Sequence, residues 1–175
     1  NEGYTLSERT VKKALEEIIP NCDKRVVVAT FSSNIHRIQQ IAEVAAASGR
    51  KLLINGRSMV SNIDIARKLG YLKIAEEQLI DLRDMRNLPP KEVLIITTGS
   101  QGEPLSALMR MALGDHKQIE LEQGDTVILS SKFIPGNEKA ISDLINNLYR
   151  RGAEVFYEKT SEIHVSGHAS REELK

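Results

Sequence analysis

The sequence contains a single cysteine, Cys22, and few aromatic residues, which make up 4% of the chain. One cysteine excludes an internal disulfide and is typical of a protein from a reducing compartment. No apolar run approaches the roughly 18 residues that a membrane-spanning helix needs, and no signal peptide opens the chain. We therefore expect a cytoplasmic protein with no membrane partner.

A surplus of charge of either sign is also absent, because 24 Lys and Arg residues balance 24 Asp and Glu residues. A domain that holds nucleic acid by its overall charge carries clustered cations. The neutral balance argues against such a domain, although it leaves room for a local basic patch. Four cations lie next to turns that contain serine, and each could meet a polyanion or be ordinary surface charge. They are Arg37, Arg57, Lys132 and Arg171.

Common nucleotide and metal motifs are missing as well. The pattern G-x-G-x-x-G is not met by Gly99-Ser100-Gln101-Gly102, and no G-x-x-x-x-G-K-[ST] occurs, which argues against a dinucleotide or P-loop site. No H-x-H-x-D-H cluster occurs either, so His164 and His168 lack the partners that a zinc site requires. We expect no metal to be bound by this chain itself.

The chain does contain an alternation of apolar runs with amphipathic helical segments. Continuous apolar runs are typical of strands covered on both faces. We expect strands at 25–31, 51–54, 79–82, 93–98, 126–130 and 154–157. Thr5 and Glu8 suggest a capping box for the first helix, and Pro104 is placed to start a later one. These patterns predict one domain over residues 1–175, an α/β fold with a largely parallel, Rossmann-like sheet flanked by helices.

Three strand-to-helix turns share small hydroxyl, amide and glycine residues. They contain Ser32, Ser33 and Asn34; Gly99, Ser100, Gln101 and Gly102; and Ser130 and Ser131, with Gly136 and Asn137 following. An α/β fold binds ligands at the carboxyl ends of its strands, where each helix N-terminus favours an anion by about 0.3–1 kcal/mol. Three converging turns could therefore hold a phosphate, but serines and asparagines also cap helices whatever the function.

The last dozen residues combine two histidines with small residues. Ile163 and Val165 predict a short buried strand, and Gly167 permits a tight turn. His164 and His168 would then stand at or just past a strand end, with room for a ligand beside them. Two solvent-exposed loop histidines are the alternative interpretation.

Five ordered blocks of the sequence resemble one known family, and they extend over essentially the whole chain. The blocks are 3–9 (GYTLSER), 30–37 (TFSSNIHR), 97–104 (TTGSQGEP), 130–138 (SSKFIPGNE) and 164–170 (HVSGHAS). In these blocks the chain resembles the β-CASP domain of the ribonuclease J family. The members of that family are RNA-processing enzymes of the metallo-β-lactamase superfamily. Five blocks in the same order are far more specific than any single motif.

This resemblance implies a site and a chemistry. In the family the β-CASP domain is inserted within a metallo-β-lactamase domain, and RNA lies in the channel between the two. His168 matches a motif histidine that acts as general acid beside the metal centre, a role typically worth about 10²–10⁴-fold in rate. The three serine-rich turns would handle the RNA backbone and a 5′-monophosphate. The stretch that would contact substrate near the scissile phosphate consists of His164, Val165, Ser166, Gly167, His168, Ala169 and Ser170.

By the same resemblance, the two zinc ions would be held by polypeptide outside this segment. The segment would be an excised domain that cleaves nothing alone, and, as an insertion, it should bring Tyr4 and Ser170 close together. The parent would be a zinc-dependent 5′–3′ exonuclease, endonuclease or both, acting in rRNA processing and mRNA decay. The oligomeric state of the parent stays open, and a homo-oligomer is one possibility.

Two other classes of protein also stay open. A phosphosugar- or nucleotide-binding Rossmann-like module would use the serine-rich turns as a phosphate cradle, although it leaves the placement of His164 and His168 unexplained. A pure interaction or dimerisation domain would show a large exposed apolar patch and no ligand. Binding of a short 5′-monophosphorylated RNA would favour the ribonuclease interpretation, whereas binding of a sugar phosphate alone would favour the Rossmann-like module.

Overall fold

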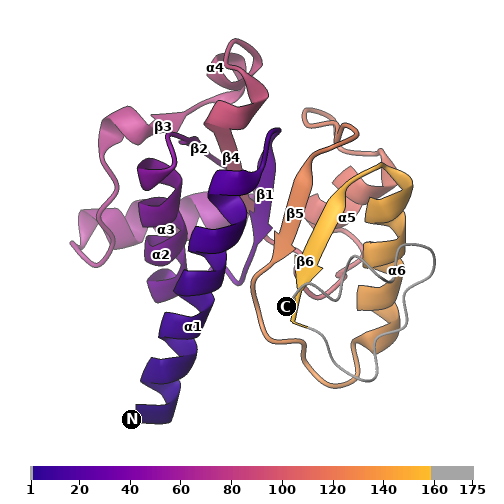
Figure 1. The fold of residues 1–175 in the computed structure, drawn as a ribbon, viewed down its shortest axis with the longest axis horizontal. Helices are drawn as coiled ribbons and strands as arrows, with labels where there is room; N and C mark the ends of the chain where they lie inside the picture. Colours follow the sequence, from indigo (N-terminus) through magenta and orange to yellow (C-terminus); the bar gives the residue numbers. More distant parts are fainter. Residues whose placement is uncertain (1, 159–175) are drawn as a thin grey trace.

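Six parallel strands form one sheet, in the order β3-β2-β4-β1-β5-β6, in the computed structural model (Figure 1). The structure describes the backbone of residues 2–158 and the side chains of residues 9–158. The strands are β1 (Val26–Ala29), β2 (Lys51–Ile54), β3 (Leu79–Ile80), β4 (Val93–Thr97), β5 (Thr126–Leu129) and β6 (Glu154–Tyr157). Every neighbouring pair is parallel. The expected α/β fold with a parallel sheet is therefore confirmed.

Helices cover both faces of this sheet. They are α1 (Glu2–Ile18), α2 (Ile35–Ala47), α3 (Arg57–Lys68), α4 (Leu82–Arg86), α5 (Ala107–Leu113) and α6 (Glu138–Arg150), with 3-10 turns η1 (Ile19–Asn21), η2 (Glu76–Gln78) and η3 (Pro90–Glu92). Val26 and Val28 of β1 pack in an apolar cluster with α1, α2 and α3, whereas Val27 and Ala29 pack with α5 and α6. Burial on both faces explains why β1 lacks polar alternation. No helix within residues 2–158 has the length and apolar character that crossing a membrane requires.

Two element boundaries in the first half differ from the sequence prediction. The helix α1 begins at Glu2, so the expected capping box at Thr5 is wrong because that position already lies inside the helix. The strand expected at 79–82 keeps only its first two residues as β3. The side chain of Asp81 accepts from Asp84 N at 2.8 Å and starts α4 there, because an aspartate in extended backbone is a strong helix cap.

A third boundary lies in the connection after β4. The sequence places the start of a helix at Pro104, whereas α5 begins at Ala107. The Ser106 hydroxyl accepts from Met109 N at 3.1 Å and caps the helix. Because α5 starts three residues later than expected, the loop that leaves the carboxyl end of β4, next to the candidate site, is longer by three residues.

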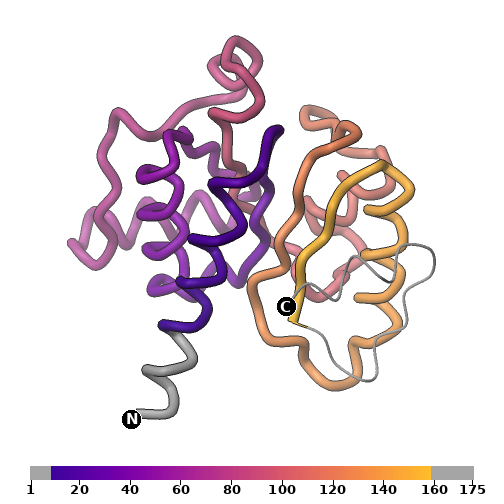
Figure 2. Tube along the Cα trace, in the orientation of Figure 1, coloured from indigo at the N-terminus to yellow at the C-terminus, as the bar shows by residue number. Residues whose placement is uncertain are grey.

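The connections after β1, β4 and β5 diverge at the carboxyl edge of the sheet. β1 continues into α2 on one face, whereas its two neighbours β4 and β5 continue into α5 and α6 on the other face. Figure 2 traces this divergence, with the indigo and magenta first half on one side and the orange and yellow second half on the other. Open α/β sheets bind ligands where neighbouring connections go to opposite faces. The three serine-containing turns occupy this position.

A buried ion pair joins the loops at the opposite, amino edge of the sheet. Arg25, just before β1, pairs with Asp125, just before β5, at 2.8 Å, and the two side chains are 12% and 2% exposed. The same guanidinium donates to the Glu120 carbonyl at 2.6 Å, and the Asp125 carboxylate accepts from Glu122 N at 2.9 Å. This cluster holds β1 and β5 in register at the end remote from the candidate site.

Candidate functional site

The three serine-containing turns lie side by side, because the strands that they follow are neighbours in the order β4-β1-β5. Backbone bonds tie the strand ends together. Thr30 N donates to the Thr97 carbonyl at 3.0 Å, and Ser130 N donates to the Ala29 carbonyl at 2.8 Å. Residues from three distant parts of the chain thus meet at one edge of the sheet.

The turn after β1 presents one exposed hydroxyl and uses its other polar groups internally. The carbonyl oxygen and the hydroxyl of Ser32 both accept from Asn62 Nδ2 of α3, at 2.9 and 3.1 Å. The Asn34 side-chain oxygen accepts from Arg37 N at 3.0 Å and caps α2. Ser33 is exposed, whereas Ser32 and Asn34 are half-buried. Of the three predicted binding residues in this turn, Ser33 is the most open to solvent.

Arg37 and Thr30 join the turn after β1 to the turn after β5. One guanidinium nitrogen of Arg37 donates to the Ser130 carbonyl at 2.6 Å and to the Ser130 hydroxyl at 3.0 Å. The Thr30 hydroxyl donates to the same carbonyl at 3.2 Å and accepts from the Ser131 hydroxyl at 3.4 Å. Ser130 and Ser131 are 7% and 8% exposed. In the structure these two predicted binding residues hold the turns together.

Gln101 ties the turn after β4 to the loop after β5. Its side-chain nitrogen donates to the Lys132 carbonyl at 3.0 Å, and its oxygen accepts from Ile134 N at 2.9 Å and Asn137 Nδ2 at 3.2 Å. Gln101 is 3% exposed and the neighbouring Ser100 is 1% exposed. Both predicted binding residues are therefore internal in the described structure, and Gln101 supports the loop after β5.

Gly99 and Gly102 let the turn after β4 pass close to neighbouring segments. Both have positive φ angles, +109° and +75°, which residues with a side chain rarely adopt. A Cβ at Gly99 would lie 2.5 Å from the Ser106 hydroxyl oxygen, and a Cβ at Gly102 would overlap the backbone carbonyl of Ala140 in α6. Conformation and packing therefore explain why glycine occupies these two predicted binding positions.

Gly102→Ala should destabilise the chain by more than the roughly 1–2 kcal/mol that a left-handed alanine costs. The extra loss is expected because α6 must move away from the new methyl group. Gly136→Ala is the matched control, since Gly136 has a φ of +101° and no heavy atom of the described residues lies within 4 Å of its Cβ position. The urea midpoint should fall for both variants and clearly further for Gly102→Ala. Equal losses would contradict the close approach to α6.

The carboxyl edge also carries uncompensated positive charge. Arg57 begins α3 and Lys132 lies in the loop after β5; both are exposed, and neither side chain has a hydrogen bond or ion pair within the described part of the chain. Arg37 of α2 is engaged, because its guanidinium donates to Ser130 in the turn after β5. The carboxylates of Glu103 and Glu138 accept from backbone N–H groups at 3.1 and 3.0 Å, which partly satisfies them. Two exposed cations without a partner among the described residues thus lie at the carboxyl edge of a chain whose net charge is zero.

Two supporting residues escaped the sequence analysis. Thr30 directly follows β1 and is 1% exposed; the signal available in the sequence was a hydroxyl residue at the end of a continuous apolar run. Asn62 lies in the middle of α3 and holds Ser32 of another turn. No local pattern marks Asn62, because its contact depends on how α3 packs beside the turn after β1.

The predicted catalytic and substrate-contacting tail lies outside the described residues. The positions concerned are His164, Val165, Ser166, Gly167, His168, Ala169 and Ser170. Within residues 2–158, no three His, Cys, Asp or Glu side chains gather as a group that could hold a metal ion. The described residues therefore do not fit a zinc ion.

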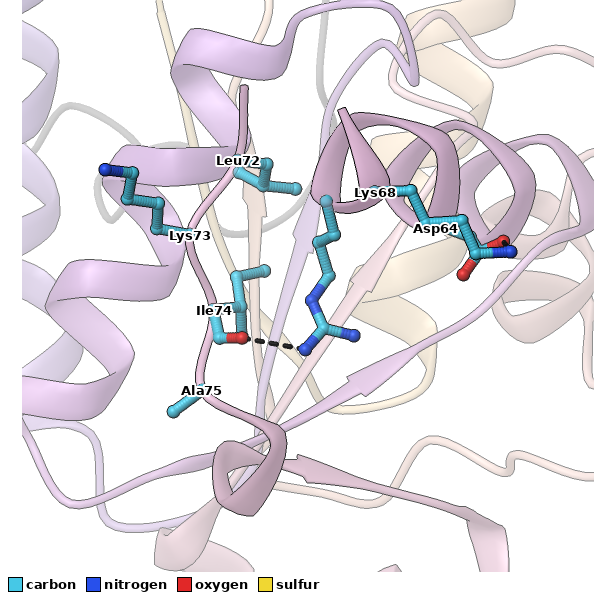
Figure 3. A pocket seen from close by; sticks show the side chains of 7 residues that line it. Asp64, Lys68, Leu72, Lys73, Ile74 and Ala75 are labelled. Carbon is cyan, nitrogen blue, oxygen red and sulfur yellow. Dashed lines mark hydrogen bonds and ion pairs between the residues drawn. The ribbon is translucent and has the colours of Figure 1, made fainter. Parts of the chain in front are cut away.

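A pocket of about 540 Å³ lies away from the three turns, between α3 and the segment 72–75 (Figure 3). Arg67 in its wall donates to the Ile74 carbonyl at 2.9 Å and pairs with Glu76 at 3.1 Å. Lys68 pairs with Asp64 at 3.0 Å. Figure 3 shows the Lys68 and Lys73 side chains pointing in opposite directions. Because Arg67 and Lys68 are paired and the two lysines point apart, the lining of this pocket does not bring its cations together on one ligand.

Comparisons with known proteins address the family directly. A family model described as "Ribonuclease J, beta-CASP domain" matches residues 23–148. Ribonuclease J of Thermus thermophilus is 49% identical over 173 residues, which are 99% of this chain and 30% of that protein. Ribonuclease J2 of Bacillus subtilis is 47% identical over 173 residues, 99% of this chain and 31% of that protein. Ribonuclease J of Mycolicibacterium smegmatis is 46% identical over 172 residues, 98% of this chain and 31% of that protein.

The chain therefore spans less than a third of the length of these curated relatives. The range matched by the family model contains β1 to β5 and all three serine-containing turns. The identities extend over nearly the whole chain, as the five ordered sequence blocks led us to expect. This chain belongs to the ribonuclease J β-CASP domain family.

Proposed function

We propose that this chain is the RNA-binding, active-site-completing domain of a zinc-dependent ribonuclease. The observation that carries the proposal is the meeting of three serine-containing turns at the edge where α/β sheets bind ligands. The exposed cations Arg57 and Lys132 lie at the same edge. Family membership supplies the reaction class, since the relatives are named ribonucleases. RNA is the substrate that the proposal assigns to this edge.

The described residues suit contacts to phosphate. Ser33 offers an exposed hydroxyl just before α2, and the dipole at the start of a helix favours an anion by about 0.3–1 kcal/mol. Arg57 and Lys132 add positive charge on either side. We assign the RNA backbone and a 5′-monophosphate to this surface, with the other predicted turn residues fixing its shape.

The chemical step would depend on residues outside the described part. In the proposal, His168 donates a proton to the leaving oxygen of the scissile phosphodiester, and residues 164–170 contact the substrate around it. Because the described residues do not fit a metal, the two zinc ions would be held by a metallo-β-lactamase domain in the remaining polypeptide. The 175-residue chain alone should therefore cleave no RNA.

The proposal includes insertion of this domain into a host domain. An insertion must leave and rejoin its host at one place. The expected proximity of Tyr4 and Ser170 stays a prediction, since Ser170 lies outside the described residues.

The finer description belongs to the same proposal. We assign the parent to the cytoplasm, to rRNA processing and mRNA decay, and to 5′–3′ exonuclease action, endonuclease action or both. Self-association of the parent through other segments would be compatible with the fold of this domain.

An NMR titration of the ¹⁵N-labelled chain tests the ligand class. A 5′-monophosphorylated RNA pentamer should shift the amide signals of Ser33, Ile35 and Lys132, and the 5′-hydroxyl pentamer should bind more weakly because it lacks the terminal charge. Fructose 6-phosphate is the competitor for the phosphosugar alternative. Binding of the sugar phosphate without any response to RNA would overturn the proposal.

A further inference from the structure

The loop 132–134 is held in place by one buried side chain. The Gln101 side chain hydrogen-bonds to both ends of the loop. It donates to the Lys132 carbonyl at 3.0 Å and accepts from Ile134 N at 2.9 Å. A third bond, from Asn137 Nδ2 at 3.2 Å, and a fourth, to the Ser100 hydroxyl at 3.4 Å, complete the amide's hydrogen bonding. The buried amide thus has its hydrogen-bond partners within the protein, as buried polar groups require, and acts as a support for the loop.

Further contacts anchor the same loop on either side of Lys132. The preceding Ser131 hydroxyl donates to Thr30 at 3.4 Å, and the following Phe133 ring stacks on Tyr157 with a centroid distance of 6.1 Å. Lys132 itself is exposed, and its ammonium group has no ion pair or hydrogen bond within the described residues. A flexible side chain is thus mounted on a rigid backbone segment.

The surroundings of Lys132 favour an anionic ligand. Ser130, two residues earlier, receives two hydrogen bonds from Arg37, so a second cation lies on the same turn. Glu103, the acid on the neighbouring turn, is engaged by Gln101 N at 3.1 Å. An ammonium group acts as a compact point charge on phosphate and does not select a base.

We infer that Lys132 contacts the phosphodiester backbone of single-stranded RNA, and that Gln101 is the positioning residue that holds it at the carboxyl edge. This inference rests on the proposed RNA-binding function of the same edge. Gln101 does not touch the RNA; it acts through the Lys132 carbonyl. Gln101 was predicted from its sequence motif to contact the substrate; its burial and its bonds to the loop give it a positioning role instead.

The salt dependence of RNA binding tests the role of Lys132 in the full-length protein. The probe is a 5′-monophosphorylated single-stranded RNA with phosphorothioate linkages, which slow hydrolysis. Each phosphate contact on a single strand contributes about −0.7 to the slope of log K against log salt. Lys132→Gln should therefore make the slope shallower by about 0.7, and Lys132→Arg should restore it. Lys91→Gln is the matched control, because Lys91 is an exposed cation in η3 just before β4, at the opposite edge.

The role of Gln101 is tested by the same slope, which a merely structural role would not move. Gln101→Met removes all four side-chain bonds at similar volume, and it should lose most of the slope contribution of Lys132. Gln101→Glu keeps the two acceptor bonds and removes both donor bonds, to the Lys132 carbonyl and to the Ser100 hydroxyl, so it is the second variant if Gln101→Met does not fold. In either double variant with Lys132→Gln, the slope should fall no further than in Lys132→Gln alone.

The outcomes separate the inference from the proposed function. If the unchanged protein binds no RNA, the proposed function fails. If it binds RNA and Lys132→Gln leaves the slope unchanged, or shifts it no more than Lys91→Gln does, the assignment of Lys132 is overturned. If Lys132→Gln shifts the slope and the Gln101 variants fold but keep the original slope, the positioning role is overturned.

Discussion

Replacing His168 with alanine in the full-length protein should lower the rate of RNA hydrolysis by about 10²–10⁴-fold, the usual worth of a positioned proton donor. The zinc content should stay unchanged, because the proposed metal ligands lie outside this chain. The measurement is the single-turnover cleavage rate of a 5′-monophosphorylated RNA, with zinc quantified on the same sample. Loss of zinc together with activity would instead identify His168 as a metal ligand.

The pH profile distinguishes a proton donor from a residue that only supports the fold. A general acid must be protonated to act, so the unchanged enzyme should lose rate on the alkaline side as the acid deprotonates. That limb should be missing from the residual activity of His168→Ala.

His116→Asn is the matched control for the loss of a histidine. Nδ1 of His116 accepts from Gln118 N at 3.1 Å and Ile119 N at 3.0 Å, and an asparagine side-chain oxygen can take over both bonds. Its activity and pH profile should match those of the unchanged enzyme. A His168→Ala enzyme as active as this control would refute the proposed role of the tail.

Arg25→Met should destabilise the chain by about 3–5 kcal/mol, because removing one partner of a buried ion pair leaves an uncompensated charge. The charge left behind is Asp125, whose side chain is 2% exposed. The Glu120 carbonyl would also lose its hydrogen-bond donor. Urea unfolding of the chain at neutral pH gives the free energy directly.

Two further variants show whether burial of the charge is responsible. In the double variant Arg25→Met/Asp125→Asn, removal of the stranded carboxylate should recover part of the loss. Lys12→Met breaks a pair with Glu43 whose side chains are 37% and 49% exposed, and it should cost no more than about 1 kcal/mol. If Arg25→Met and Lys12→Met cost the same, burial of the Asp125 charge is not the cause of the loss.

The strands and their order of appearance were predictable because burial on both faces leaves a local record. The ranges 51–54 and 154–157 match β2 and β6, and the other apolar runs contain β1, β4 and β5. At two other places the predicted element boundary was wrong, because a side chain caps a helix at a different residue. At 79–82 an aspartate cap ended the strand after two residues, and at Pro104 a serine cap three residues before Met109 set the helix start at Ala107. The helix propensity of the residues alone does not decide which of several possible capping residues starts the helix.

The location of the candidate site was also predictable, whereas the division of labour within it was not. A parallel sheet brings all strand-to-helix turns to one edge, so small polar residues after three strands had to gather there. Sequence reasoning treated Ser100, Gln101 and Ser130 as equals of Ser33. Burial separates them, because the first three support the turns and only Ser33 is exposed. The donor that holds Ser32, Asn62, is 30 residues away in sequence.

The amino-acid sequence by itself determined the family, the α/β class and the gathering of the three serine-containing turns at one edge of the sheet, because motif order and apolar periodicity are local properties of the chain. Only the tertiary structure decided which polar side chains face outward and which act as internal ties. That decision depends on the strand order β4-β1-β5 and on the packing of α3 and α6 against the turns. Contacts between segments remote in sequence leave no periodic trace, so they become visible only when the chain is folded.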